Sequence, residues 1–215
     1  MAISTLADLS SQVAAFLNRQ DLTTQIPVFV QLAESRIAYG SKEAPFISEP
    51  LRIRSMEVSA FATFNAQMIQ LPTGYLQQRR LYISGSPNTE LVYVTPDLFW
   101  KRWLSSTSGT PCEFTVEGEN IVLGPTPDVA YTGQILYFKQ FTPLVSPTDT
   151  NWLLTNAPAV YLNGTLLEAF KYIRNTNQAT AYLNSFCGIV NGLNQANKAD
   201  RYAGPWQAKT DIWNP

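Results

Sequence analysis

The sequence predicts an α+β protein, in which N- and C-terminal helices form a helical bundle and an antiparallel β sandwich or barrel-like domain is inserted between them. Apolar residues recur at helical spacing near both ends of the chain, whereas the period changes to two in between. Short helices with one apolar stripe can bury it only against one another or a partner, so we expect the two ends to pack together. The predicted division is a helical bundle domain at 1–44 and 151–203, a β-rich domain at 45–150, and an extended C-terminal arm at 204–215.

Two amphipathic helices are predicted in the N-terminal part. The first covers residues 5–18 and starts with a capping box at Thr5 and Asp8. The second covers residues 23–39 and ends at Gly40. The residues expected to cap the second helix are Thr23 or Thr24, and its apolar stripe comprises Ile26, Val30, Ala33 and Ile37.

The region of period two predicts roughly seven short strands and one short helix. Turn residues separate the strands, so we expect sequence neighbours to pair, and Gly118-Glu119 is the clearest hairpin signal. The predicted strands are 57–64 with 67–71, 79–84 with 90–94, 113–117 with 120–123, and 134–141, and the predicted helix is 96–104.

Two more helices are predicted toward the C-terminus. Asn156 is expected to cap the first, with Pro158 in its first turn. The second begins near Thr176, and its apolar residues alternate in spacing between four and three, which is close to a heptad seam. The predicted seam comprises Tyr182, Phe186, Ile189, Leu193 and Ala196.

The composition indicates a surface suited to assembly. Charged residues make up 14% of the chain, below the roughly 25% usual in soluble domains, so Asn, Gln, Ser and Thr must cover much of the surface. The net charge of −1 argues against nonspecific nucleic-acid binding, which needs Lys and Arg. We expect a soluble chain made in a cytoplasm, without a signal peptide or membrane span. Cys112 and Cys187 are expected to be buried free thiols, with a disulfide between them as the alternative.

Catalytic chemistry has little support in the sequence. The chain contains no histidine, the commonest general acid/base and metal ligand. Glu113 and Glu117 share one face of a predicted strand, and paired carboxylates can hydrolyse glycosides, but acids beside a turn usually only solvate it. Phosphate loops, nucleophile elbows and zinc spacings are missing from the sequence. We therefore expect no enzyme activity, no cofactor and no metal.

Three features suggest contacts with partners. The arm carries Trp206, Ile212 and Trp213, and Trp is enriched at binding hot spots, so the arm is expected either to dock on a partner or to fold back over its own core. Trp100 and Trp103 share one side of a predicted helix, and a core role for both is the favoured interpretation. Basic residues occur in pairs that can contact DNA phosphates or a neighbouring subunit, or are ordinary surface charge: Arg52 and Arg54, Arg79 and Arg80, and Lys101 and Arg102.

Several segments, in order, resemble the head-to-tail adaptor proteins of tailed bacteriophages. The best match is IVLGPTP at residues 121–127. Each segment alone is weak, but the ordered set covers most of the chain. The other segments are 21–37, 71–83, 136–139 and 152–158, followed by 161–162 and 166–169.

The resemblance implies a structural virion protein of the neck, assembled in the host cytoplasm. Adaptors of this kind form a ring of about twelve copies beneath the portal, with cyclic symmetry. The implied partners are other copies of the chain, the portal protein, tail or nozzle proteins, and double-stranded DNA that passes through without sequence-specific binding. The helical bundle is expected to meet neighbouring subunits and the portal, the β domain to face the tail, and the arm from Trp206 to Trp213 to reach the portal.

Other functions remain open at this stage. The nearest alternative is another tail component, such as a tail-tube, nozzle or tail-completion protein. A carbohydrate-binding module could use the aromatic residues of 131–141 as stacking platforms. The least favoured alternative is an enzyme acting on cell-wall glycans through Glu113 and Glu117.

Overall fold

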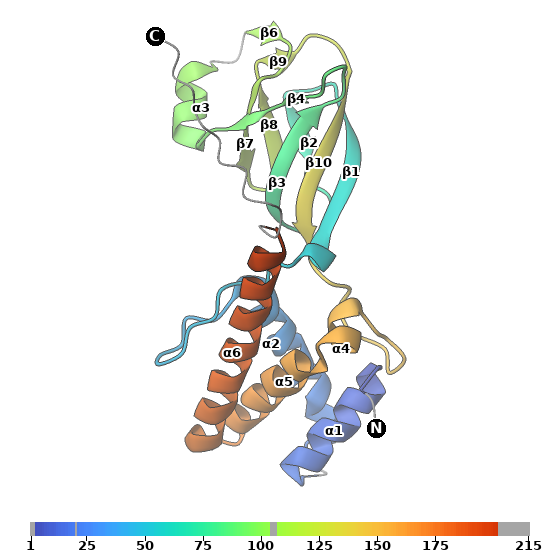
Figure 1. The fold of residues 1–215 in the computed structure, drawn as a ribbon, viewed down its shortest axis with the longest axis vertical. Coiled ribbons are helices and arrows are strands. Elements are labelled where there is room, and N and C mark those ends of the chain that lie inside the picture. The colour runs from blue at the N-terminus through green and yellow to red at the C-terminus, as the bar shows by residue number, and fades with distance from the viewer. Residues whose placement is uncertain (1–2, 20, 104–106, 202–215) are drawn as a thin grey trace. The chain divides into compact units, whose positions relative to one another are not determined.

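The computed structural model describes residues 3–19, 21–103 and 107–201, so the predicted arm at 204–215 lies outside the described residues. The fold is α+β, as predicted, with helices at both ends of the chain and predominantly antiparallel sheets between them (Figure 1). The chain divides into two compact units. We call residues 55–142 the β unit, and the segments before and after it together the helical unit.

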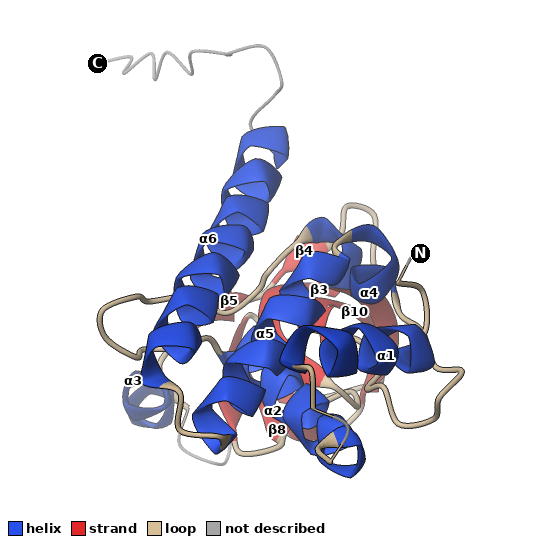
Figure 2. Ribbon diagram, turned by 90° about the horizontal axis from the view of Figure 1, so that it is seen from below, coloured by secondary structure: helices blue, strands red, loops and turns tan. Residues whose placement is uncertain are grey.

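The helical unit is organised around one central helix. Helix α5 (Pro158–Tyr172) contacts α1 (Leu6–Leu17), α2 (Ile26–Tyr39), α4 (Trp152–Asn156) and α6 (Thr176–Arg201) (Figure 2).

Gly164 lets two of these helices approach α5 closely. A Cβ atom at Gly164 would lie 3.0 Å from the Cβ of Ala33 on α2 and 3.2 Å from the ring of Phe186 on α6. Any larger side chain at this position would push the helices apart, because such interiors are close-packed.

The ends of the first two helices show where local signals hold and where they fail. The capping box of α1 is confirmed: the Asp8 N–H donates to Thr5 Oγ1 at 3.2 Å, and the Thr5 N–H donates to Asp8 Oδ2 at 3.0 Å. Gly40, with φ of 80°, ends α2 as predicted. The expected threonine cap is wrong, because residues 23–25 form a 3-10 turn (η1, Thr23–Gln25) that leads straight into α2.

The expected asparagine cap of the third predicted helix is also wrong. Asn156 is the last residue of the short helix α4, and α5 starts at Pro158 without a side-chain cap. Asn151 is the asparagine that caps, since its Oδ1 accepts the Leu154 N–H at 2.9 Å at the start of α4.

The buried face of α6 is displaced by one residue from the predicted seam. Phe186 is buried as predicted, but Tyr182, Ile189 and Leu193 are only half-buried and Ala196 is exposed. The displacement brings the polar Asn194 into the buried face, and its partner is a distant backbone segment described below. The buried residues are Ala179, Leu183, Phe186, Cys187, Val190 and Asn194.

The β unit contains two sheets that face each other across one core. Within the described residues, one four-stranded sheet has the order β1 (Glu57–Phe64), β10 (Tyr131–Lys139), β3 (Tyr75–Ile83), β4 (Thr89–Glu90). The other has the order β2 (Met68–Gln70), β8 (Asn120–Gly124), β7 (Glu113–Glu117), β5 (Val92–Tyr93). A small pair is formed by β6 (Ser108–Gly109) and β9 (Thr126–Pro127).

One predicted strand pairing is wrong, and a second is confirmed only in part. The strands β1 and β2 were expected to pair with each other, but β1 pairs with β10 and β2 pairs with β8, in different sheets. The predicted strand 90–94 is divided in the same way, because β4 pairs with β3 whereas β5 runs parallel to β7. The β7–β8 hairpin is confirmed. Consecutive strands change sheets here because each must bury one face in the shared core.

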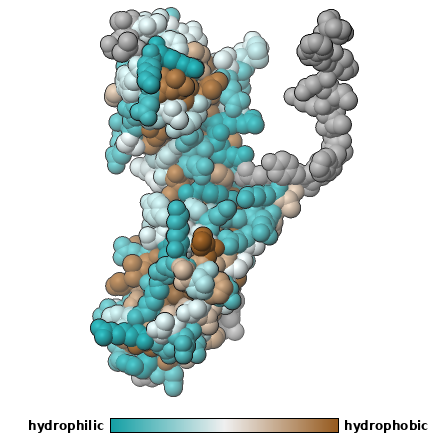
Figure 3. Space-filling model, turned by 90° about the vertical axis from the view of Figure 1, so that its left-hand side faces the viewer, coloured by the Kyte–Doolittle hydropathy of each residue, from teal (hydrophilic) through white to brown (hydrophobic). Residues whose placement is uncertain are grey.

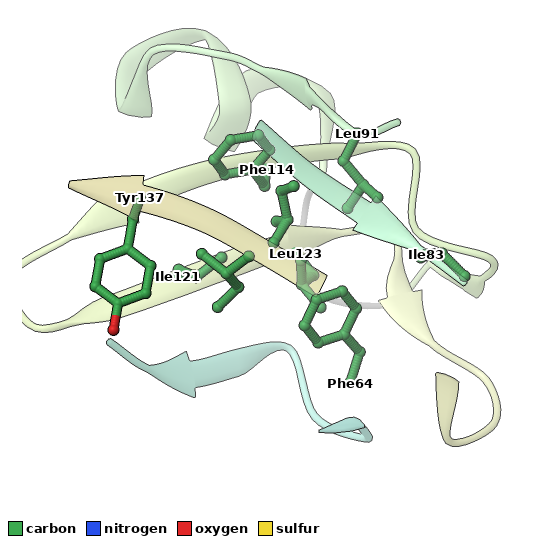
Figure 4. Packing of buried hydrophobic residues seen from close by; sticks show 9 residues of the cluster. Phe64, Ile83, Leu91, Phe114, Ile121, Leu123 and Tyr137 are labelled. Atoms are coloured by element: carbon green, nitrogen blue, oxygen red, sulfur yellow. The ribbon is translucent and has the colours of Figure 1, made fainter. Parts of the chain in front are cut away.

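The core of the β unit lies between the two sheets (Figure 4). It contains Phe64 from β1, Leu81 and Ile83 from β3, Phe114 from β7, and Ile121 and Leu123 from β8, with Leu91, Ile135 and Tyr137. Gly133 on β10 is required beneath the Phe64 ring, since a Cβ atom there would lie 2.0 Å from that ring.

Three asparagines of α6 hold the chain that leads from α2 toward β1. Each side-chain amide accepts an N–H and donates to the carbonyl two residues earlier, as a neighbouring strand would. Asn191 pairs with Ile47 O (3.0 Å) and Glu49 N (3.3 Å), Asn194 with Pro50 O (3.1 Å) and Arg52 N (2.9 Å), and Asn197 with Arg52 O (3.1 Å) and Arg54 N (2.9 Å). We call residues 47–54 the strap.

The return connection from the β unit is held by Glu34 on α2. Its Oε1 accepts the Leu144 N–H at 2.9 Å and the Tyr161 hydroxyl at 3.2 Å, and Asn151 donates to that hydroxyl at 2.8 Å. Burial raises the pKa of Glu34 above its ordinary value of 4.5, because the charged form loses solvation that these bonds only partly replace.

Asn194→Ala should lower the free energy of unfolding by about 1–3 kcal/mol, because the Arg52 N–H and the Pro50 carbonyl lose their partner at a buried position. Urea denaturation measures the change. Gln195→Ala, at the exposed neighbouring position, is the matched control and should stay within about 0.5 kcal/mol of the parent. Equal effects in the two variants would contradict the role given to the asparagines.

Glu34→Gln should make unfolding less sensitive to pH. A raised pKa in the folded state means that the folded protein binds more protons than the unfolded chain, so the contribution of Glu34 is fully present below pH 4.5 and is lost as pH rises through the raised pKa. The stability of Glu34→Gln relative to the parent should therefore increase from acid to neutral pH. Denaturation at a series of pH values tests this, and a constant difference would show that the pKa is unshifted.

Candidate functional site

The first candidate pair of basic residues, Arg52 and Arg54, belongs to the strap. The Arg52 guanidinium donates to the carbonyl oxygens of Ala38 at 3.0 Å and Leu51 at 2.7 Å, so it helps to close the C-terminus of α2. Burial lowers the pKa of Arg52, because the charged form loses solvation. The side chain still carries its charge, since arginine is not deprotonated in proteins. Arg54 is exposed and forms an ion pair with Asp200 of α6 at 3.4 Å.

The second pair, Arg79 and Arg80, lies on β3 at an irregularity in the sheet. In the ladder Leu136 lies opposite Arg80 and Tyr137 opposite Gln78, so Arg79 is left out of register. Arg79 forms an ion pair with Glu57 and lies over the Phe138 ring at 5.6 Å. Arg80 donates to the Tyr82 hydroxyl at 2.9 Å and lies 3.7 Å from Glu90. The two side chains thus have different partners.

The third pair belongs to α3 (Pro96–Arg102), a helix that packs on β7. Arg102 forms an ion pair with Glu113, and Lys101 is exposed. Each pair of basic candidates thus has its own local surroundings. Arg52 and Arg54 are in the helical unit, the other four are in the β unit, and five of the six have partners within the chain.

The two tryptophans of the α3 segment explain the carboxylates singled out in the sequence. Trp100 and Trp103 are half-buried against a cluster of Val94, Phe99 and Val122, which agrees with a core role. The Trp103 Nε1–H donates to Glu113 Oε2 at 2.8 Å, and the Trp100 Nε1–H donates to Glu117. The paired glutamates thus fasten α3 to β7.

The sequence analysis missed an apolar surface on α2. Val28, Leu32 and Tyr39 are 48%, 46% and 70% exposed, on the side of α2 opposite its buried stripe. We call these three residues the α2 outer face. Their spacing of four and seven is a helical signal in the sequence, but it was obscured by the stronger stripe on the other side. Hydrophobic patches of this kind interrupt the polar surface of the protein (Figure 3).

Metal and membrane sites have no support in the part of the chain that the structure describes. There, no group of three or more His, Cys, Asp and Glu residues comes together, and no helix is both long and apolar enough to cross a bilayer. Both cysteines are free. Cys187 is buried as expected, but Cys112 is exposed, which corrects the expectation for that thiol. The arm candidates Trp206, Ile212 and Trp213 lie outside the described residues.

Glu113→Ala should weaken the attachment of α3, lowering the free energy of unfolding by about 1–3 kcal/mol, because the indole of Trp103 and the guanidinium of Arg102 lose a charged acceptor. Chemical denaturation with tryptophan fluorescence as the probe measures this. Glu119→Ala, in the exposed turn of the same hairpin, should leave both stability and the emission spectrum nearly unchanged. A stable Glu113→Ala variant with native emission would contradict the assigned role.

Comparison with known proteins identifies the family. Comparison with curated proteins gave no match. A family model described as SU10 adaptor protein matches residues 4–209, which span both units and most of the chain. The chain therefore belongs to the SU10 adaptor protein family, a family of phage adaptors, in agreement with the head-to-tail adaptors that its sequence resembles.

Proposed function

We propose that this protein is the head-to-tail adaptor of a tailed phage. In this proposal about twelve copies form a ring with cyclic symmetry, which joins the portal to the tail or nozzle and continues the DNA channel in the neck of the virion. The observation that carries the proposal is the family match over residues 4–209, because it includes both the helical unit and the β unit.

The surface chemistry is suited to such a ring. A closed ring needs two different patches on each subunit that meet head to tail. Low charge lowers the desolvation cost of packing one copy on the next, and 14% of residues are charged here. Five of the candidate basic residues are also already engaged within the subunit.

A weak attraction for DNA follows from the same charges. The net charge is −1, so the chain as a whole has no excess of Lys and Arg over Asp and Glu. Nonspecific affinity depends on the number of phosphates that Lys and Arg neutralise. We therefore propose that double-stranded DNA passes through the channel without sequence-specific binding.

The C-terminal arm is proposed to dock on the portal. Trp206, Ile212 and Trp213 provide large apolar side chains in a segment bounded by prolines. Ordering such a segment only on docking costs conformational entropy, but it can confine ring formation to the portal.

The test is to mix the purified protein with the portal ring encoded in the same genome and to image the mixture by electron microscopy. The full chain should form a second ring stacked on the portal. A version that ends at Ala203 should lose the stacked ring, because it lacks the two tryptophans and Ile212. Both proteins should have the same melting temperature, which excludes misfolding as the cause.

Each other outcome changes the proposal in a specific way. A stacked ring that survives the truncation keeps the adaptor function and removes the docking role of the arm. A protein that does not associate with the portal is not its adaptor. Binding of the same preparation to tail or nozzle proteins would then assign it to a tail component.

A further inference from the structure

The α2 outer face exposes apolar side chains that nothing in the described part of the subunit covers. The exposed residues of α2, all of which lie within the described chain, are Pro27, Val28, Gln31, Leu32, Ser35 and Tyr39, and none is charged. Val28 and Leu32 form a ridge one turn apart, and Tyr39 continues it toward the end of the helix. Such a ridge on a solvated surface favours contact with another apolar surface.

The exposed side of α6 has the opposite shape. Opposite its buried residues it presents a row of mostly small side chains, which is interrupted by Gln195 near its end: Ala181, Ser185, Gly188, Gly192, Gln195 and Ala199. We call this row the α6 outer face. A Cβ atom at Gly188 or Gly192 would meet no atom of the described residues within 4 Å, so packing inside the described subunit does not require glycine at either position.

The two glycines work against the helix in which they lie. Glycine in a helix interior is destabilising relative to alanine, because it loses more backbone freedom on folding. Residues that break a local rule without any gain inside the subunit indicate a gain outside it. At Gly188 and Gly192 the lack of a side chain would allow another backbone or bulky side chains to approach closely.

We propose that the α2 outer face of one copy packs against the α6 outer face of the next copy in the ring. The large side chains of Val28, Leu32 and Tyr39 complement a surface on which Gly188 and Gly192 carry no side chain. Neither face carries a charge that would have to be desolvated. Rows four residues apart on both helices would interdigitate, which favours a crossing angle of about −50°.

The arrangement of the helices allows this contact to repeat. Both α2 and α6 pack on α5, so each copy carries the two outer faces on two different helices of one unit. A contact between two different patches is heterologous and propagates from copy to copy until a ring closes. This inference rests on the proposed adaptor ring, which it extends by naming the surfaces that join the copies.

The first experiment damages each face separately. Leu32→Glu places a charge on the ridge, and the double variant Gly188→Leu/Gly192→Leu adds large side chains to the α6 outer face. Phe16→Glu is the matched control, because Phe16 is an exposed apolar residue on α1 outside both faces. Ring formation is measured by electron microscopy and by mass photometry, with and without the portal ring. All variants are checked by thermal melting.

We expect the parent and Phe16→Glu to form rings, and both face variants to lose at least nine-tenths of them. The double glycine variant should melt at or above the parent temperature, since leucine favours helix more than glycine does and its Cβ atom meets no neighbour at these exposed positions. Rings from the parent and from both face variants would overturn this inference and leave the adaptor function intact. A Leu32→Glu variant that still forms rings but no longer binds the portal would also overturn this inference, because the α2 outer face would then contact the portal and not the next copy. A parent that forms no ring in any condition would overturn the proposed function itself.

The second experiment tests which faces meet. Leu32→Cys and Gly188→Cys are made separately in a Cys112→Ser background, which removes the exposed native thiol. The two proteins are mixed under assembly conditions and oxidised, because a disulfide forms only where the Cα atoms lie within about 7 Å. Cross-links should join one variant to the other and should be rare within either variant alone. Efficient cross-linking of Leu32→Cys to itself would contradict a head-to-tail contact.

Discussion

Every peptide group of an extended segment needs a hydrogen-bond partner, and this requirement controls how the chain leaves the helical unit. Within the described residues the strap at 47–54 makes a single β-bridge, between Ser48 and Ser41, so Asn191, Asn194 and Asn197 of α6 supply partners that a neighbouring strand would otherwise give. Their spacing of three along the helix matches alternate peptide groups of the strap. Segments about 140 residues apart in the sequence are thereby fixed to each other before β1 begins.

The same requirement explains why α6 buries the face that it does. Asn194 points at the strap from the same face of the helix that buries Leu183, Phe186, Cys187 and Val190. The opposite side, with Ala181, Gly188 and Gly192, is then left facing outward. The asparagines that hold the strap and the α6 outer face therefore lie on different sides of one helix. The orientation of the helix that places the asparagines also places the α6 outer face.

Polar side chains with apparent catalytic or nucleic-acid roles are largely used to join elements of this fold. Glu113 and Glu117 hold the indoles of Trp103 and Trp100, so the carboxylate pair on β7 serves as an attachment point for α3. Arg52 closes the C-terminus of α2 in a similar way. A chain of low charge that uses its ionic groups internally leaves uncharged surfaces for contacts with other proteins, which suits a component of a virion.

The sequence by itself determined the properties that depend on near neighbours. The α+β class, the capping box at Thr5 and Asp8, the end of α2 at Gly40 and the β7–β8 hairpin all follow from residues within one or two turns of each other. The order of the segments around IVLGPTP also indicated the family. Only the tertiary structure decided the separation of β1 and β2 into different sheets, the burial of Asn194 and the partners of Glu113. These depend on contacts between distant segments, whose free energy outweighs local propensity and leaves no periodic signal in the sequence.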